Sequence, residues 1–102
     1  MGHSVSVIIN KPGEKTFVFD GDFTIQTIET TKDDIQNNLK DASLLILDLN
    51  GLNIIDISFL QLLYSVVLYC EKNKISVQFS ANSISEDCKT IINKSGFEKI
   101  IK

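Results

Sequence analysis

The sequence predicts an α/β fold in which helices cover one face of a mixed β-sheet. Residues 4–10 and 15–20 alternate apolar and polar side chains on either side of Lys11-Pro12-Gly13-Glu14, which is typical of an antiparallel hairpin. The short apolar run Leu44–Leu47 is typical of a buried strand, and apolar residues then recur at helical spacing. The expected order is β-β-α-β-α-β-α with a possible short C-terminal strand. A hairpin followed by βαβ units implies a mixed sheet.

The hairpin is followed by the first predicted helix. Gly21 is expected to end the second strand, and Thr24 to precede the helix. The helix extends to about residues 40–41. Its predicted buried face consists of Ile25, Ile28, Ile35 and Leu39.

The segment 43–74 is the one around which the rest of the chain is organised. After the strand at its start, Asn50-Gly51 predicts a turn, and a second apolar segment, 52–55, leads to Asp56. Ser58, followed three residues later by Gln61, predicts a capping box at the start of a long helix. A joint between strand and helix exposes backbone N–H groups and short polar side chains. We therefore expect the functional site at this joint.

The long helix has more apolar surface than one buried stripe requires. Its outer side holds Leu62, Leu68 and Tyr69 as well as the polar Gln61 and Ser65. Such a helix is either covered on both sides or presents an apolar face to a partner, and we favour the partner. The buried stripe is expected to contain Phe59, Leu60, Leu63, Val66, Val67 and Cys70.

The last third of the chain predicts a strand at 75–79 and one more helix. Ser83 and Glu86 indicate a second capping box, and Gly96 is placed to end the helix. Residues 97–101 form either a short final strand or a tail. The expected buried stripe of the helix is Ile84, Cys88, Ile91 and Ile92.

Length and charge limit the possible functions. The 102 residues form one domain, with a core between about residues 4 and 97. A net charge of -3 leaves no basic surface for nucleic acid or anionic lipid. No signal peptide is apparent, and the densest apolar segment, 54–70, is short for a membrane span. We expect a cytoplasmic protein without membrane insertion, in which Cys70 and Cys88 are buried thiols.

The sequence does not predict an enzyme. It contains one histidine (His3, near the terminus), no Cys/His cluster, no glycine-rich phosphate loop and no convincing pair of catalytic carboxylates. We therefore expect no catalytic residue, no metal site and no cofactor.

The central segment resembles the STAS domain family, to which bacterial anti-sigma-factor antagonists belong. The resemblance rests on Leu45–Leu49, on Ile54–Leu60 and on Leu62-Leu63, and the order of elements matches over most of the chain. The family pattern is an apolar strand ending in Asp-Leu, then a short loop, then Asp-Ser/Thr-Ser-Gly-Leu opening a helix. The run 60–63 resembles the family variant encoded beside chemotaxis kinases.

The resemblance implies specific roles at the joint. Asp56 matches the family's loop aspartate, and Ser58 matches the serine that partner kinases phosphorylate. Ile57 replaces the usual Ser or Thr, and Phe59 replaces the usual Gly or Ala. A small residue at 59 leaves room for a partner, so Phe59 either fills that room or turns inward. Without the resemblance, Ser58 reads as an N-cap and Asp56 as an acceptor for loop amides.

Three functions follow from these features. The first is a protein-binding module switched by phosphorylation of Ser58, with a serine-kinase anti-sigma factor as partner. The second is a non-phosphorylated adaptor in a chemosensory array or an ABC lipid-transport complex. The third is a small-molecule site at the helix start, where amides can hold an anion. The sequence leaves the oligomeric state open. The expected partner-binding residues are Asp56, Gln61, Leu62, Ser65 and Tyr69.

Overall fold

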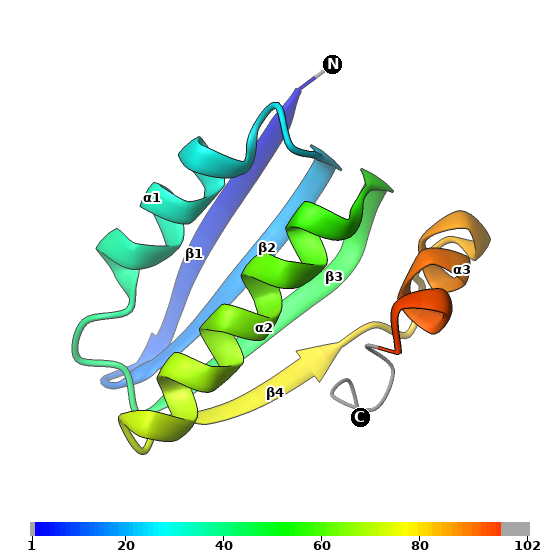
Figure 1. Cartoon of the computed structure of the whole chain (residues 1–102). Helices are drawn as coiled ribbons and strands as arrows, with labels where there is room; N and C mark the ends of the chain where they lie inside the picture. The colour runs from blue at the N-terminus through cyan, green and yellow to red at the C-terminus, as the bar shows by residue number, and fades with distance from the viewer. Residues whose placement is uncertain (1, 97–102) are drawn as a thin grey trace.

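The computed structural model describes residues 2–96, and within them the elements follow the expected order (Figure 1). The hairpin and the three helices are present in the predicted parts of the chain, with differences at the starts of the first and third helices. The elements are β1 (His3–Lys11), β2 (Glu14–Phe23), α1 (Ile28–Asn38), β3 (Leu44–Ile55), α2 (Ile57–Lys72), β4 (Ser76–Ser80) and α3 (Glu86–Ser95).

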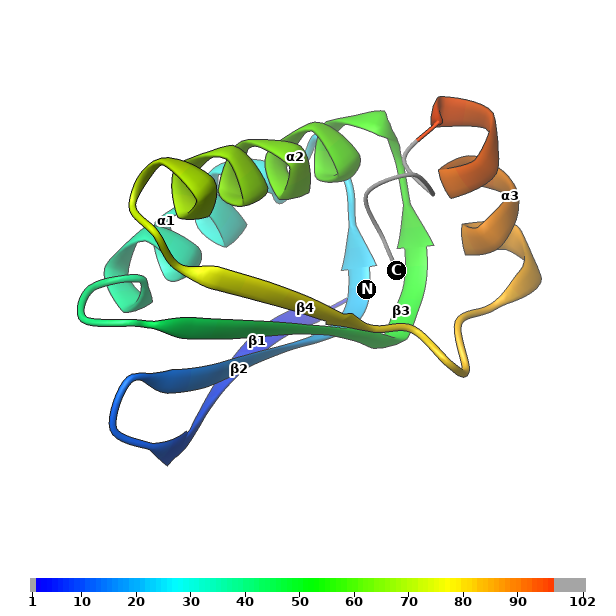
Figure 2. The same ribbon diagram turned by 90° about the horizontal axis from the view of Figure 1, so that it is seen from below.

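The sheet is mixed, as predicted. Its strand order is β1-β2-β3-β4, with β1 antiparallel to β2 and the other two neighbouring pairs parallel. Helices α1 and α2 lie on the same face of the sheet, and α3 packs at the far end of β3 (Figures 1 and 2). No helix among residues 2–96 covers the opposite face (Figure 2).

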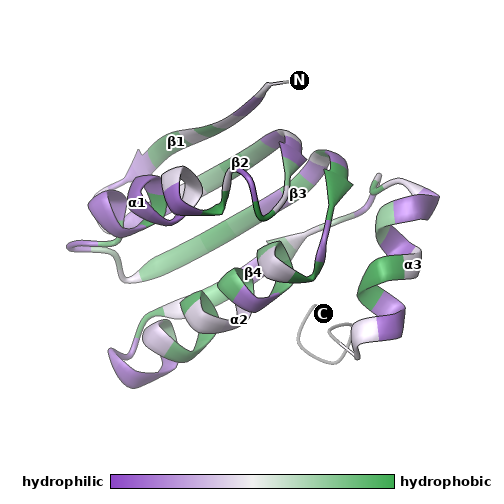
Figure 3. Cartoon of the chain, turned by 45° about the horizontal axis from the view of Figure 1, so that its top comes forward, coloured by the Kyte–Doolittle hydropathy of each residue, from purple (hydrophilic) through white to green (hydrophobic). Residues whose placement is uncertain are grey.

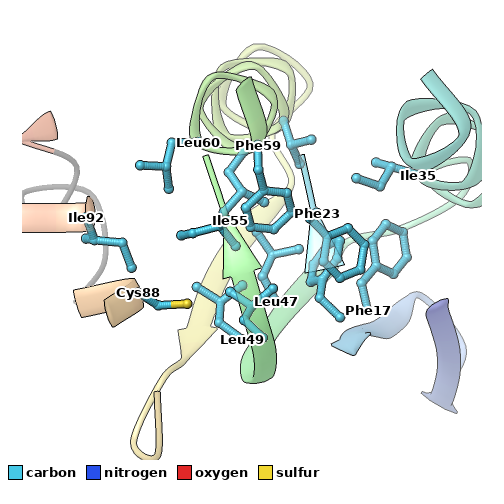
Figure 4. Close-up of a cluster of buried hydrophobic side chains, with 14 of the residues drawn as sticks. Phe17, Phe23, Ile35, Leu47, Leu49, Ile55, Phe59, Leu60, Cys88 and Ile92 are labelled. Carbon is cyan, nitrogen blue, oxygen red and sulfur yellow. The ribbon is translucent and has the colours of Figure 1, made fainter. Parts of the chain in front are cut away.

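The core lies between this sheet and α2. Alternate residues of β2 and β3 point toward the helices, so Phe17, Phe19, Leu45, Leu47 and Leu49 are fully buried. Figure 4 shows Phe17, Leu47 and Leu49 in this cluster. The expected buried stripe of α2 is confirmed in full, because Phe59, Leu60, Leu63, Val66, Val67 and Cys70 are all buried.

The sequence predicted that Gly21 ends the second strand, and this prediction is wrong. Strand β2 continues to Phe23, and Gly21 adopts a positive φ of 106°. A Cβ on Gly21 would lie 2.4 Å from the carbonyl oxygen of Gly2. The glycine therefore allows β2 to bend and to approach the start of β1 closely. The register of the neighbouring β2–β3 pair shifts between Gly21 and Asp22.

The predicted turn at Asn50-Gly51 is a bulge inside one long strand. Strand β3 continues through it to Ile55, and the β2–β3 register shifts between Val18 and Asp20. A Cβ on Gly51 would meet the carbonyl oxygen of Phe19 at 2.9 Å, so glycine permits the strands to stay paired. The Asn50 amide donates to Asp48 and Ser80, which ties the bulge to β4.

The first helix begins three residues later than Ile25. The Thr27 N–H donates to the Thr24 carbonyl, and the Thr24 N–H donates to the Thr27 hydroxyl. These bonds form a turn that precedes α1, so Ile25 is exposed instead of buried. Ile35 and Leu39 are buried as expected, whereas Ile28 is half-buried.

The N-cap of the third helix is Ser85, so the predicted capping box of Ser83 and Glu86 is wrong. The Ser85 hydroxyl accepts a hydrogen bond from the Cys88 N–H. Gly96 ends the helix in the left-handed conformation, as predicted. Cys88 and Cys70 are buried free thiols, and burial raises the pKa of Cys70 to about 11. The possible final strand, 97–101, lies outside the described residues.

Leu63 and Leu68 provide a matched test of which side of α2 is buried. Leu63 is fully buried, whereas Leu68 is 46% exposed on the same helix. Leu63→Ala is expected to lower the free energy of unfolding by about 2–5 kcal/mol, because it leaves a cavity. Leu68→Ala should lower it by less than about 1 kcal/mol. Urea denaturation measures both, and equal losses would show that the helix is oriented differently.

Candidate functional site

The candidate site begins where β3 passes into α2, and Asp56 is its central residue. Asp56 has extended backbone geometry and is the N-cap of α2. Its Oδ1 accepts from the N–H groups of Ser58 (3.1 Å) and Phe59 (3.4 Å). Its Oδ2 accepts from the Ile25 N–H at 2.9 Å. One carboxylate thus caps the helix and joins it to the turn before α1.

Ser58 lies in the first turn of α2 and is not its cap, so the predicted capping box with Gln61 is wrong. The Ser58 hydroxyl donates to Asp56 Oδ1 at 2.5 Å and remains half-buried at the surface. The physical reason is that Asp56, two residues earlier, already accepts from the first free N–H groups of the helix. A charged acceptor also makes a stronger bond than a hydroxyl.

These bonds determine the charge state of Asp56. Desolvation by burial acts to raise its pKa, but the hydrogen bonds outweigh it. The donors are the Ser58 hydroxyl and the N–H groups of Ile25, Phe59 and Ser58, and the pKa lies below the ordinary 3.8. Asp56 is therefore ionised at neutral pH.

The same hydrogen bonds argue against the third possible function, an anion site at the start of this helix. An external anion would need the N–H groups of Ser58 and Phe59, and the Asp56 carboxylate already accepts from both. The geometry therefore gives no support to a small anion bound at this position.

Phe59 turns inward and does not occupy the space beside Ser58. Its side chain is fully buried in the core beside Phe23 (Figure 4). Its ring centroid lies 5.4 Å from that of Phe19 and 5.1 Å from that of Phe23. Ile57 points the other way and is 54% exposed. The phenyl ring that replaces the family's usual Gly or Ala at position 59 therefore lies in the core.

Beyond this joint, the exposed side of α2 is uncharged. No residue from Ile57 to Cys70 carries a charge, whereas the exposed positions of α1 and α3 are rich in Asp, Glu and Lys. Hydrophilic colour dominates α1 in Figure 3, and α2 is largely hydrophobic or intermediate until its last turn. We define the outer face of α2 as Ile57, Gln61, Tyr64, Ser65, Leu68 and Tyr69, all of which are exposed.

A hollow lies on each side of this face. The first, of about 390 Å³, is lined by Ile57, Gln61 and Tyr64 together with the end of α3. The second, of about 330 Å³, lies between α1 and α2, and Leu62, Ser65 and Tyr69 line it. An uncharged helix with a hollow on either side is the type of surface on which proteins associate.

The structure separates the predicted phosphoacceptor and partner-binding residues into two groups. Asp56 and Ser58 are joined at the helix start, and Gln61 lies one turn further along the helix. Leu62, Ser65 and Tyr69 line the hollow beside α1. Leu62 is half-buried and packs against the core, so less of its side chain is available to a partner than of Ser65 and Tyr69, which are exposed.

Sequence reasoning missed Ile25, Ile57 and Tyr64 as members of the site. Tyr64 could have been found, because it follows the predicted residue Gln61 by three positions and so lies on the same side of the helix. Ile25 could not, because its place depends on a contact with Asp56 across 31 residues.

Metal binding and membrane insertion can be addressed for residues 2–96. Among them, no group of His, Cys, Asp and Glu side chains is arranged to hold a metal ion. None of the helices in this part of the chain has the length and apolar character needed to cross a membrane.

Comparison with known proteins identifies the fold and the family pattern. The family model described as STAS domain matches residues 7–102. None of the curated proteins compared with the chain matches it. Three solved structures are similar along most of the chain, at identities that establish only a shared fold.

The first of these structures is an anti-sigma factor antagonist from Mycobacterium paratuberculosis, with a TM-score of 0.80, 16% identity, and coverage of 98% of this chain and 83% of that one. The antisigma-factor antagonist STAS domain from Rhodobacter sphaeroides has a TM-score of 0.70 and 22% identity, covering 82% and 92%. The Bacillus cell fate determinant SpoIIAA in its phosphorylated form has a TM-score of 0.71 and 13% identity, covering 97% and 89%.

The lowered pKa of Asp56 predicts an acid-sensitive contribution to stability. A carboxyl group with a lowered pKa in the folded state stabilises the fold above its ordinary pKa. That contribution is lost as the pH falls through the folded value, below 3.8. Asp56→Ala should lower the free energy of unfolding by about 0.5–2 kcal/mol at pH 7 through loss of the cap.

The difference between wild type and Asp56→Ala should then shrink below pH 4, as measured by thermal melts between pH 7 and pH 2.5. Asp33→Asn, on the exposed side of α1, controls for the change in net charge. A difference that stays constant down to pH 2.5 would contradict the proposed role of the ionised carboxylate.

Proposed function

This chain belongs to the STAS domain family, and from that premise we propose that it is a regulatory protein-binding module switched by phosphorylation of Ser58. Domains of this family are regulatory modules and not enzymes. In the proposal, the unmodified chain binds a serine-kinase anti-sigma factor in the cytoplasm through the outer face of α2. The kinase phosphorylates Ser58, and the phosphorylated chain is released.

The observation that carries the proposal is the uncharged outer face of α2, which begins beside Ser58. Four large apolar side chains on this face are each about half exposed: Ile57, Tyr64, Leu68 and Tyr69. A folded chain gains nothing from exposing such a row to water, but an interface gains from burying it. The centre of a protein interface is also depleted of charge. These properties support a protein partner.

The environment of Ser58 supports a switch at one end of this face. Because Phe59 is buried, the serine is flanked on the surface by Ile57 and not by the larger phenyl ring. A phosphate on Ser58 would add a charge of about −1.5 to −2 next to Asp56 and at the edge of an uncharged surface. A partner that buries this edge would have to desolvate that charge without a counter-ion, which weakens binding.

A second candidate is a non-phosphorylated adaptor, which could serve a chemosensory array or an ABC lipid-transport complex. The extent of the outer face favours it, since Tyr69 lies eleven residues from Ser58, or about 16 Å along the helix. A phosphate at Ser58 affects contacts close to the helix start much more than contacts near Tyr69. An adaptor that binds mainly around Tyr69 therefore needs no switch at Ser58.

The switch predicts a specific loss of affinity in Ser58→Asp. Its melting temperature should stay within about 4 °C of wild type, because the helix start tolerates an acidic residue. Its affinity for the anti-sigma kinase should fall at least about tenfold, which is about 1.4 kcal/mol. Isothermal titration calorimetry measures the affinity, and thermal melts report on the fold.

Two variants control for the substitution itself. Ser58→Ala should bind nearly as tightly as wild type, since it adds no charge. Ser76→Asp introduces the same carboxylate at an exposed serine of β4, which points to the opposite face of the sheet from its core-packed neighbour Val77, and should leave affinity unchanged. Equal affinities of wild type and Ser58→Asp would reject the switch and favour the adaptor.

A further inference from the structure

The turn before α1 carries an exposed isoleucine directly beside the candidate site. Ile25 is 66% exposed, the highest value for a large apolar side chain among residues 2–96. Its N–H donates to Asp56 Oδ2 at 2.9 Å. Ile57 follows Asp56 directly and is 54% exposed, so one exposed isoleucine is the chain neighbour of Asp56 and another donates its N–H to the Asp56 carboxylate.

The turn that carries Ile25 holds itself together. The Thr27 N–H donates to the Thr24 carbonyl at 2.9 Å, and the Thr27 hydroxyl donates to the same oxygen at 3.2 Å. The Thr24 N–H donates to the Thr27 hydroxyl at 3.2 Å. Among the hydrogen bonds of the described residues, the one that joins this turn to α2 is that from Ile25 to Asp56. The ends of the turn are held by the pairing of Phe23 with Ile55 and by the bonds from Thr31 to the Thr27 carbonyl. Loss of the Ile25–Asp56 bond therefore frees only the middle of the turn, where Ile25 lies.

Asp56 divides its two oxygens between the turn and the serine. Oδ2 accepts from Ile25, and Oδ1 accepts from the Ser58 hydroxyl at 2.5 Å as well as from the first amides of α2. Phosphorylation converts the Ser58 hydroxyl into an ester oxygen without a hydrogen, so the shortest of these bonds cannot form. The phosphate also repels the carboxylate to which that hydroxyl donated. The carboxylate then rotates away from the phosphate while the first amides of α2 still hold Oδ1, and the bond of Oδ2 to the Ile25 N–H is lost.

We propose that Ile25 contacts the partner and that Asp56 holds it in place only while Ser58 is unmodified. In the unmodified chain, Ile25 and Ile57 form one apolar surface across the joint. It fits a partner with an apolar, uncharged contact at this point. Phosphorylation separates the two isoleucines in addition to adding charge. This inference rests on the proposed function, since it names a further contact of the same site and the way the switch reaches it.

The coupling can be tested on the isolated full chain by NMR, without any partner. The probe is water exchange of the Ile25 amide in wild type and in the chain carrying phosphoserine at position 58. Losing a hydrogen bond to a charged acceptor should speed the exchange of Ile25 about tenfold. Exchange of the Thr27 amide, bonded within the turn, should be unchanged. Unchanged exchange of Ile25 on phosphorylation would overturn the coupling.

Two variants separate the roles of the residues. Asp56→Ala should speed the exchange of the Ile25 amide even when Ser58 is unmodified, because it removes the hydrogen-bond acceptor. Ser58→Ala should keep the amide protected, because it removes the hydroxyl without adding charge. A protected Ile25 amide in Asp56→Ala would show that another group holds the turn and would overturn the inference.

The partner contact needs a separate measurement. Ile25→Ala should weaken binding of the anti-sigma kinase to the unmodified chain about fivefold or more, as expected for an apolar contact within an interface. Thr30→Ala, exposed on the adjoining α1, is the matched control and should bind as wild type does. If Ser58→Asp weakens binding while Ile25→Ala does not, the contact is wrong and the proposed switch stands. If neither affects binding, the proposed function itself is wrong.

Discussion

The burial of Phe59 against Phe19 and Phe23 fixes the start of α2, and the geometry of the site depends on it. The three rings come from β2 and α2 and are all fully buried. On a helix, neighbouring residues are about 100° apart, so a buried Phe59 turns Ile57 and Ser58 toward the surface. The aromatic cluster in the core therefore determines which side chains of the joint can meet a partner.

Asp56 completes this arrangement with hydrogen bonds that β3 alone could not supply. As the N-cap, it satisfies the amides that the helix leaves free, and it reaches the turn before α1. A capping Ser or Asn would also satisfy one of those amides, but only a carboxylate combines two acceptor oxygens with a charge. That charge strengthens the bond from the serine hydroxyl and makes the joint sensitive to a second negative charge.

The order of elements and the buried side of α2 were predictable from the sequence, because both follow from periodicity. The errors have a common physical origin in contacts between distant residues. Gly21 and Asn50-Gly51 have the composition of turns, yet pairing between β2 and β3 keeps both within strands. Ile25 fits the helical period, but the turn formed by Thr24 and Thr27 excludes it from the helix.

The candidate site was predicted in outline and not in its hydrogen bonds. The family pattern pointed to Asp56 and Ser58, and helical spacing pointed to Tyr69; their roles in binding a partner stay predictions. The capping role was assigned to the wrong residue, because Ser58 with Gln61 matches a capping box in sequence, and Asp56 competes for the same amides only once the chain is folded. The outer face of α2 was partly visible in the sequence, since an uncharged helix beyond its buried stripe already indicates a partner.

The central claim is that the partner binds at the joint and along the outer face of α2, and isoleucine methyl NMR tests it most directly. The chain has exposed isoleucines at both candidate surfaces. Ile25 and Ile57 lie at the joint, and Ile8 lies on the face of the sheet that α1 and α2 leave uncovered. On titration with the anti-sigma kinase, the methyl signals of Ile25 and Ile57 should shift or broaden, and that of Ile8 should not. Changes at Ile8 with unchanged signals at Ile25 and Ile57 would place the partner on the bare face of the sheet and contradict the account.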